Sequence, residues 1–301
     1  MLAARSRTEL LALVALLVMT AAWGSTFFLI KDVVTRIPVP DLLTIRFAIA
    51  ALALGIIAAP RLQMSGTVIR YGVLLGVLYG AAQILQTAGL AHTSASFSGF
   101  VTGLYIVATP LLTALILRRR VPRLTWLPAI LATVGLGVLS LHGFALGYGE
   151  LLTLVAAVIY AGHIVALGQF SKPETALSLS FVQLIIITLV TAAAALWPTA
   201  GSPAGIQLPA NGQDWLIVLY LAIVASAMTM VLQTWAQAHI EASRAAVIMA
   251  MEPVWAAAFA VTLGGETITS RMVIGGVAIV TAMYLVERPQ RDRSDARELV
   301  S

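Results

Sequence analysis

The sequence predicts an all-α polytopic membrane protein, with ten transmembrane helices arranged as two inverted five-helix repeats around a central cavity. Three observations predict this fold: 60% of the 301 residues are hydrophobic, only 10% are charged, and long apolar stretches recur ten times. A soluble domain carries about 25% charged residues. Because this chain lacks the polar side chains to cover a surface in water, the lipid bilayer is its expected solvent.

Each apolar stretch is long enough to cross a bilayer, which takes about 20 residues in a helix. The connections between the stretches are short, so the chain forms one membrane unit without a separate soluble domain. The expected spans are residues 10–30, 41–60, 67–91, 97–117, 124–141, 149–169, 175–197, 213–236, 243–262 and 271–287.

The positive charges predict how these spans are oriented. With the N-terminus in the cytoplasm, 14 of the 18 Lys and Arg residues fall on the cytoplasmic side, and Lys31, Arg36 and Arg271 fall on the outer side. Arg46 lies within the second span. This asymmetry follows the positive-inside rule. We therefore expect a multi-pass protein of the bacterial inner (cytoplasmic) membrane with both termini in the cytoplasm, and the basic composition needs no nucleic-acid partner.

An internal duplication organises the chain. His92 and His239, each preceded by Ala, lie 147 residues apart, whereas Pro110 and Pro253 lie 143 residues apart. A repeat with an odd number of crossings places its two copies in opposite orientations, as in many secondary transporters. The predicted units are a first five-helix repeat over 1–143, a second over 144–287, and a cytoplasmic tail over 288–301.

Pro110 and Pro253 are candidate hinges, because each lies inside an expected span. A proline within a helix removes one backbone hydrogen bond and kinks the helix. The freed carbonyl needs another partner in lipid, so such a kink usually faces protein or a water-filled cavity. A hinge beside a transport pathway is the favoured interpretation, and a static bend that improves packing is the alternative.

Polar and aromatic residues recur at helical spacing in five spans, and Gly72, Gly76 and Gly80 would let another helix approach the third span closely. Single polar residues could act as glue between helices, worth ~0.6–2 kcal/mol per contact. Five such faces together favour a hydrated cavity instead. The candidate substrate-binding or pathway-lining residues are Trp23, Tyr79, Gln83, Gln86, Thr102, Tyr105, Thr109, Tyr160, His163, Met230, Gln233, Glu252 and Trp255.

Three ionisable residues inside the spans have more than one interpretation. Glu252 lies near mid-membrane, where a charge costs at least ~2.5 kcal/mol; it could bind protons, pair with a substrate amine, or act as a structural hydrogen-bonding group. His163 could relay protons, although a neutral packing role fits a lone histidine better. Arg46 could extend to the membrane surface or anchor a substrate carboxylate in the cavity.

Five short motifs recur in a known family: Trp23-Gly24-Ser25, Gly103-Leu104-Tyr105, Thr109-Pro110-Leu111, Met251-Glu252-Pro253-Val254 and Gly264-Gly265-Glu266. With these motifs the chain resembles the EamA-type transporters of the drug/metabolite transporter superfamily, and most of all the bacterial YddG-type (aromatic) amino acid exporters. The resemblance implies a basket of ten helices around a central cavity, and export of aromatic and other neutral amino acids by alternating access. It also implies that the third, fourth, eighth and ninth spans supply much of the pathway.

Other functions receive less support from the sequence. Efflux of lipophilic cations or other small metabolites is the alternative, because Glu252 and the aromatic residues suit a cation. The chain has no cysteine and only four scattered histidines, so we expect no catalytic residues, no metal site and no cofactor, and therefore no enzyme. The expected partners are amino acids and the lipid bilayer, and we expect a monomer.

Overall fold

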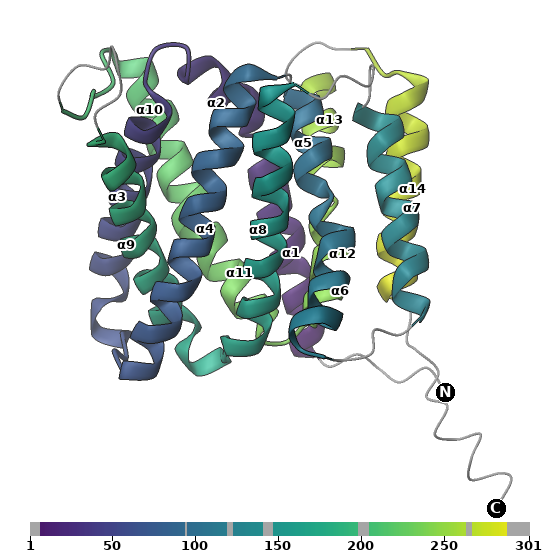
Figure 1. The fold of residues 1–301 in the computed structure, drawn as a ribbon, viewed down its shortest axis with the longest axis horizontal. Coiled ribbons are helices and arrows are strands. Elements are labelled where there is room, and N and C mark those ends of the chain that lie inside the picture. The colour runs from purple at the N-terminus through teal and green to yellow at the C-terminus, as the bar shows by residue number, and fades with distance from the viewer. Residues whose placement is uncertain are drawn as a thin grey trace, which may run out of the picture.

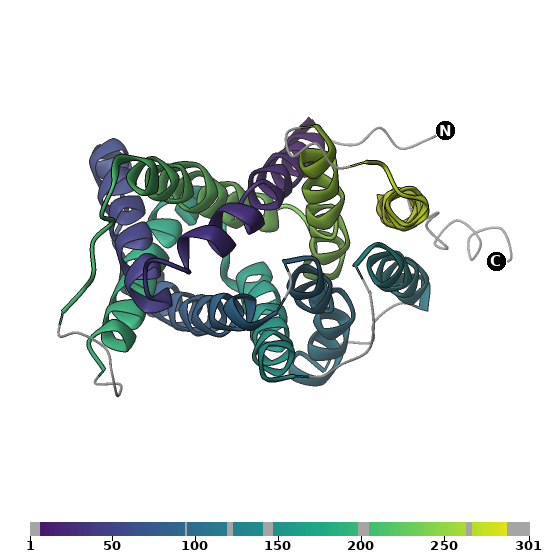
Figure 2. The same cartoon turned by 90° about the horizontal axis from the view of Figure 1, so that it is seen from above.

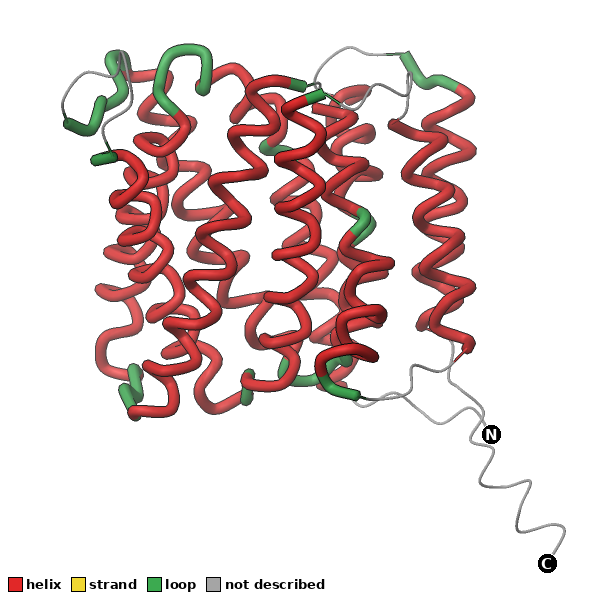
Figure 3. Tube along the Cα trace, viewed as in Figure 1, coloured by secondary structure: helices red, strands yellow, loops and turns green. Residues whose placement is uncertain are grey.

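The computed structural model describes residues 7–93, 95–118, 123–140, 147–197, 205–262 and 267–287. The described residues form helices joined by short connections, without a strand (Figures 1 and 3). Six helical segments are long and apolar enough to cross a membrane: Arg7–Val33, Val39–Arg61, Gly66–His92, Tyr148–Phe170, Pro173–Ala195 and Gly212–Gln237. Three shorter apolar helices cover Val101–Ile116, Thr125–Val138 and Ser270–Val286.

The helices stand side by side, with the connection from α2 to α3 at the upper end of Figure 1 and the connection from α3 to α4 at its lower end. The first part of the chain forms α1 (Arg7–Gly24), α2 (Phe27–Val33), α3 (Val39–Ala58), α4 (Gly66–His92), α5 (Ala95–Gly103), α6 (Tyr105–Ile116) and α7 (Arg123–Ser140). The second part forms α8 (Tyr148–Phe170), α9 (Ala176–Ala195), α10 (Gly212–Ala222), the π-helical segment η3 (Ile223–Met228), α11 (Thr229–Gln237), α12 (Ala242–Met249), α13 (Glu252–Thr262) and α14 (Ser270–Glu287).

Side-chain caps fix where two of the long helices begin. Ser65 accepts a hydrogen bond from the backbone N–H of Val68 at the start of α4, and Asn211 accepts one from Asp214 at the start of α10. Such caps satisfy N–H groups that have no partner within the helix. Both helices therefore begin close to the membrane boundaries expected from hydropathy.

Two helices are interrupted within the bundle, at Leu104 between α5 and α6 and at residues 250–251 between α12 and α13 (Figure 3). The helix that follows each interrupted pair has the same bounds at an offset of 147 residues. Helix α7 covers Arg123–Ser140, and adding 147 to both residue numbers gives 270–287, the bounds of α14. At this offset Tyr105, the first residue of α6, corresponds to Glu252, the first residue of α13.

Pro110 and Pro253 do not occupy equivalent positions relative to these breaks. Pro110 lies inside α6, whereas Pro253 is the second residue of α13. The first turn of a helix tolerates proline because its N–H groups have no acceptor within the helix. The breaks at Leu104 and at 250–251, rather than the prolines, are the equivalent features, and the hinge role of the prolines stays a prediction.

Glycines allow α4 to pack closely against two neighbouring helices, α8 and α9. A Cβ added at Gly72 would lie 2.5 Å from Val182 of α9, and one at Gly76 would lie 2.6 Å from Ile186. The close approach predicted for this glycine face is thus confirmed. The pair of α7 and α14 packs together at one side of the bundle (Figure 2).

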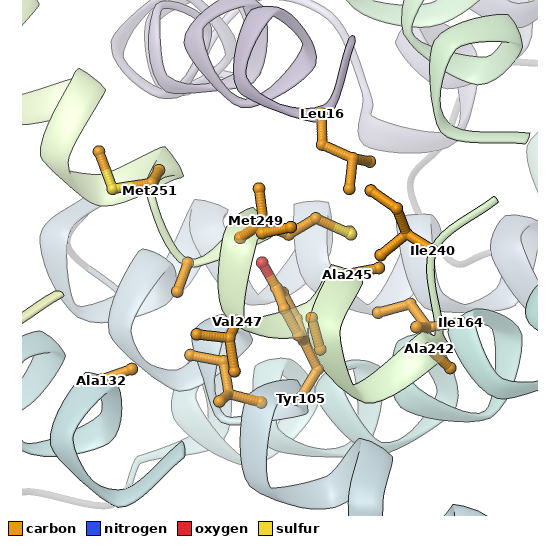
Figure 4. Close-up of a cluster of buried hydrophobic side chains, with 14 of the residues drawn as sticks. Leu16, Tyr105, Ala132, Ile164, Ile240, Ala242, Ala245, Val247, Met249 and Met251 are labelled. Atoms are coloured by element: carbon orange, nitrogen blue, oxygen red, sulfur yellow. The ribbon is translucent and has the colours of Figure 1, made fainter. Parts of the chain in front are cut away.

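Two apolar clusters flank the middle of the bundle. The first includes Leu16 of α1, Ile164 of α8 and much of α12 (Figure 4). The second includes Phe47 of α3, Leu184 of α9 and Met230 of α11. Trp23 packs against both clusters, and it lies at the wall of the space that separates them.

Candidate functional site

A cavity lies between the two clusters and draws its walls from both parts of the chain. About 60 Å³ of its space can hold the centre of a water molecule. A buried water needs about 10–15 Å³ of such space, so the cavity has room for a few waters. Its lining residues are Trp23, Thr26, Phe27, Ile30, Arg46, Tyr79, Gln83, Gln86, Thr87, Leu90, Thr102, Tyr105, Tyr160, Ile164, Gln233, Met249 and Glu252.

The cavity lies towards the upper end of the bundle. Leu90 is in the last turn of α4, and Phe27 and Ile30 belong to the short helix α2 at that end. Towards the lower end, Ile164 and Met249 of the cavity wall continue into the first apolar cluster, which includes Leu16 and the alanines of α12 (Figure 4). The space is therefore closed towards the lower end by packed apolar side chains.

The structure brings together nine of the residues predicted to line a pathway and leaves four outside the cavity. The nine are Trp23, Tyr79, Gln83, Gln86, Thr102, Tyr105, Tyr160, Gln233 and Glu252. The four outside are Thr109, His163, Met230 and Trp255, which are buried or half-buried among the helices behind the cavity wall.

Hydrogen bonds connect the polar side chains along the cavity wall. The hydroxyl of Tyr160 donates to Oε1 of Gln86 at 2.9 Å, and Nε2 of Gln86 donates to the hydroxyl of Thr102 at 3.0 Å. Nε2 of Gln83 donates to the hydroxyl of Tyr79 at 3.2 Å. These bonds join α8, α4 and α5 and hold the amides in place, so the wall presents fixed polar groups between aromatic rings.

Glu252 is the acidic residue of the cavity wall. It follows the helix break at 250–251, and its residue is 9% exposed. Its backbone carbonyl packs against Gly24 of α1. Among the described residues its carboxylate has neither a hydrogen-bond donor nor a cationic partner, so it remains available to a ligand in the cavity.

Arg46 supplies the positive charge of the same cavity. The residue is 3% exposed, and its Nε donates to the hydroxyl of Ser226 at 2.6 Å while Nη2 donates to the carbonyl of Ala225 at 3.0 Å. The guanidinium also lies 5.0 Å from the centroid of the Phe47 ring. The interpretation that Arg46 extends to the membrane surface is therefore wrong, because the π-helical segment binds it inside the bundle.

The local geometry of η3 explains how it can bind this cation. A π-helical turn leaves carbonyls outside the ordinary i→i−4 pattern and often marks a functional site. The Ser226 hydroxyl donates to the carbonyl of Leu221, five residues earlier, at 2.8 Å. Nε1 of Trp23 donates to the carbonyl of Ala225 and to the hydroxyl of Thr229, each at 3.2 Å. Trp23 and Arg46 thus meet at one carbonyl of the π-helical segment.

His163 lies behind the wall, in a separate polar contact. Its Nε2 is 2.9 Å from Oε1 of Gln183, and Nε2 of Gln183 donates to the carbonyl of Leu179 at 3.3 Å. The ring stacks edge-on against Tyr79, with centroids 5.1 Å apart. Nδ1 of His163 is buried and has no hydrogen-bond partner in the structure. This geometry favours the packing interpretation over a proton relay.

Charged contacts attach α2 to both parts of the bundle at the upper end. Lys31 donates from Nζ to the carbonyls of Leu90 and Thr93 at the end of α4. Arg36, just after α2, pairs with Asp32 at 2.6 Å and with Asp214 at the start of α10 at 2.7 Å. Hydrogen bonds to Asp32 and Asp214 raise the pKa of Arg36 above its ordinary value, so it remains a cation.

Seven lining residues were not predicted: Thr26, Phe27, Ile30, Thr87, Leu90, Ile164 and Met249. Arg46 also lines the cavity, which was one of the two interpretations of its position in the second span. Thr87 and Ile164 lie four residues beyond Gln83 and Tyr160, so continuing the helical spacing would have found both. The bend after Gly24, which turns Thr26, Phe27 and Ile30 into the cavity, leaves no comparable signal in an apolar stretch.

Comparison with known proteins agrees with this architecture. The model of the EamA-like transporter family matches residues 10–141 and again residues 147–288. An uncharacterized transporter of Archaeoglobus fulgidus is 30% identical over 277 residues, which cover 92% of this chain and 84% of that protein. The pseudopaline exporter CntI of Pseudomonas aeruginosa strain UCBPP-PA14 is 24% identical over 274 residues, covering 87% of this chain and 91% of the relative.

A solved structure, described only as a protein crystal structure, shares the fold. It superposes with a TM-score of 0.71 at 21% identity, covering 99% of this chain and 100% of the other. The two family matches together cover most of the sequence. The chain therefore belongs to the EamA-like transporter family, whose members are multi-pass membrane transporters.

Proposed function

We propose that the protein is a secondary transporter that exports amino acids, aromatic and other neutral ones among them, by alternating access. The observation that carries the proposal is the cavity itself, in which amides, hydroxyls and five aromatic residues line a space between apolar helices. Ligand sites commonly combine aromatic walls with a few placed polar groups. A neutral amino acid matches such a site, because its backbone carries polar groups and its side chain can pack against the aromatic walls.

We further propose ten spans in two inverted repeats, with the lower end and both termini in the cytoplasm of a bacterial inner membrane. Two adjacent matches to one family model and the recurrence of helix bounds at an offset of 147 residues support the duplication. Cations gather at the lower end, where Arg61, Lys172 and Arg244 lie in or beside the connections between helices. The chain acts as a monomer in this proposal.

The closed lower end supports alternating access. A cavity that lies above a packed apolar cluster corresponds to a state that cannot receive a substrate from the cytoplasm. Transport then requires a second state in which α12 and α1 separate at the lower end. The breaks at Leu104 and at 250–251 interrupt helices within the bundle, and in this proposal the half-helices tilt about Pro110 and Pro253.

Arg46 favours amino acids over the alternative of lipophilic cations. A buried guanidinium in the wall repels a singly charged cation, whereas it can bind a carboxylate. A relative that is 24% identical is named as a pseudopaline exporter, which is consistent with the direction of transport proposed for this chain.

Counterflow in proteoliposomes tests this function. Vesicles that contain the purified protein and unlabelled phenylalanine should accumulate labelled phenylalanine, while cationic dyes should not exchange. Thr87→Phe fills the cavity wall and should abolish the exchange, whereas Leu52→Phe, at a lipid-facing side chain that is 64% exposed, should retain it. Dye exchange without amino acid exchange would favour the cation alternative, and equal activity of both variants would show that this cavity is not the route.

A further inference from the structure

The cavity wall contains one buried residue of each charge, on different helices. Arg46 belongs to α3 and Glu252 to α13, and both line the cavity. A charge near the centre of a bilayer costs at least ~2.5 kcal/mol, and buried charges are usually paired. Arg46 and Glu252 nevertheless do not form an ion pair with each other, nor with any other residue that the structure describes.

Arg46 is positioned before a substrate arrives. Its two hydrogen bonds to Ser226 and Ala225 use two of the five N–H donors of a guanidinium. The planar guanidinium can bind both oxygens of a carboxylate at once. Because the π-helical segment fixes one side of the group, a substrate carboxylate need not first order a mobile arginine.

Glu252 supplies the complementary acidic group in the wall of the same cavity. Its side chain follows a helix break and has no donor among the described residues, and Trp23 and Tyr105 also line the cavity. A carboxylate accepts hydrogen bonds from the three donors of an ammonium group. Aromatic faces add cation–π attraction for the same group.

Building on the proposed function, we propose that Arg46 binds the carboxylate and Glu252 binds the ammonium group of one zwitterionic substrate. The cavity then selects molecules that carry both charges and rejects molecules that carry one. A lone cation leaves Arg46 without an anion, and a lone anion leaves Glu252 without a cation. Arg46 and Glu252 are therefore specificity-determining residues.

Three compounds that share the phenylalanine side chain and differ in the charged groups they carry test the proposal by thermal stabilisation of the purified full-length protein. Phenylalanine carries both charges, phenylalaninamide carries only the ammonium group, and N-acetylphenylalanine carries only the carboxylate. The parent should bind phenylalanine about 10- to 100-fold more tightly than either analogue, because each loses one charged hydrogen-bonded contact. Arg46→Gln should lose the preference over phenylalaninamide only, and Glu252→Gln should lose the preference over N-acetylphenylalanine only.

Two further variants separate charge from folding. Arg46→Lys keeps the cation, and Ser226→Ala removes one of its hydrogen bonds without removing the charge; both should keep the order of preference. Equal binding of the three compounds by the parent, or the same preference in all variants, overturns the inference. If amino acid counterflow continues while Arg46→Gln and Glu252→Gln leave selectivity unchanged, the proposed function survives and the zwitterion site does not. Charge-selective binding without counterflow would instead support the zwitterion site and reject amino acid transport.

Discussion

The carbonyl oxygen of Glu252 lies 2.7 Å from the position that a Cβ atom on Gly24 would occupy. The same Cβ would lie 2.8 Å from the backbone nitrogen of Ala256. Backbone atoms of a packed helix cannot move aside as the end of a flexible side chain can. Gly24 therefore sets how closely α1 approaches α13 beside the cavity.

We predict that Gly24→Ala lowers the free energy of unfolding by about 1–3 kcal/mol, as overpacking does, and reduces transport by moving Glu252. Gly162→Ala is the matched control, because a Cβ there would meet no atom within 4 Å and alanine favours helix by about 1 kcal/mol. Unfolding in denaturing detergent measures the free energy of unfolding of both variants. Equal stability of the two variants would show that α1 can shift without cost.

The orientation of the bundle can be tested with single cysteines, because the chain has no native cysteine. Gln63 is exposed at the lower end and Gln213 is exposed at the upper end. In intact cells a membrane-impermeant maleimide should label Gln213→Cys, whereas Gln63→Cys should react only after permeabilisation. The opposite pattern would place the basic end outside and reverse the proposed direction of export.

The ion pairs of Arg36 should differ in their contribution to stability. The side chain of Asp32 is 55% exposed, whereas that of Asp214 is 2% exposed. Arg36→Gln leaves a buried carboxylate without its cation, so it should lower the melting temperature clearly. Asp32→Asn removes only the exposed pair and should change the melting temperature little. A larger effect of Asp32→Asn would contradict the burial of Asp214.

His163 should act through packing rather than through proton transfer. His163→Leu leaves Oε1 of the buried Gln183 without its partner, which costs about 1–3 kcal/mol of unfolding free energy. Replacing both residues with leucine should recover part of that loss, because both polar groups are then absent. Transport corrected for folded protein should persist in both variants. Loss of concentrative transport at unchanged stability would instead identify His163 as a relay.

The helical spacing of polar residues predicts the cavity where a helix is continuous. Tyr79, Gln83 and Gln86 lie on one face of α4, and all three line the cavity. Beyond a helix break the spacing no longer predicts which residues line the cavity, because the break changes the direction in which the following helix faces point. Thr102 and Tyr105 line the cavity on either side of Leu104, whereas Thr109 does not.

The role of Arg46 could not be read from its own helix. The position of Arg46 in the second span suggested that its side chain reaches either the membrane surface or the cavity. One of the acceptors that Arg46 binds is a carbonyl of η3, which lies 179 residues further along the chain. A π-helical turn departs from the 3.6-residue period on which sequence patterns rest. The sequence therefore shows the charged residue but not its acceptors.

The π-helical segment also leaves the direction of the helix beyond it nearly unchanged. A π-helical turn takes in one residue more than an α-helical turn, so deleting one residue within 223–228 would let the span close into a regular α-helix and would leave α11 in nearly its present orientation. The carbonyl of Ala225 that accepts from both Trp23 and Arg46 would then belong to a regular turn. One additional residue in this span thus supplies an acceptor to two distant side chains while the helix beyond it stays in register.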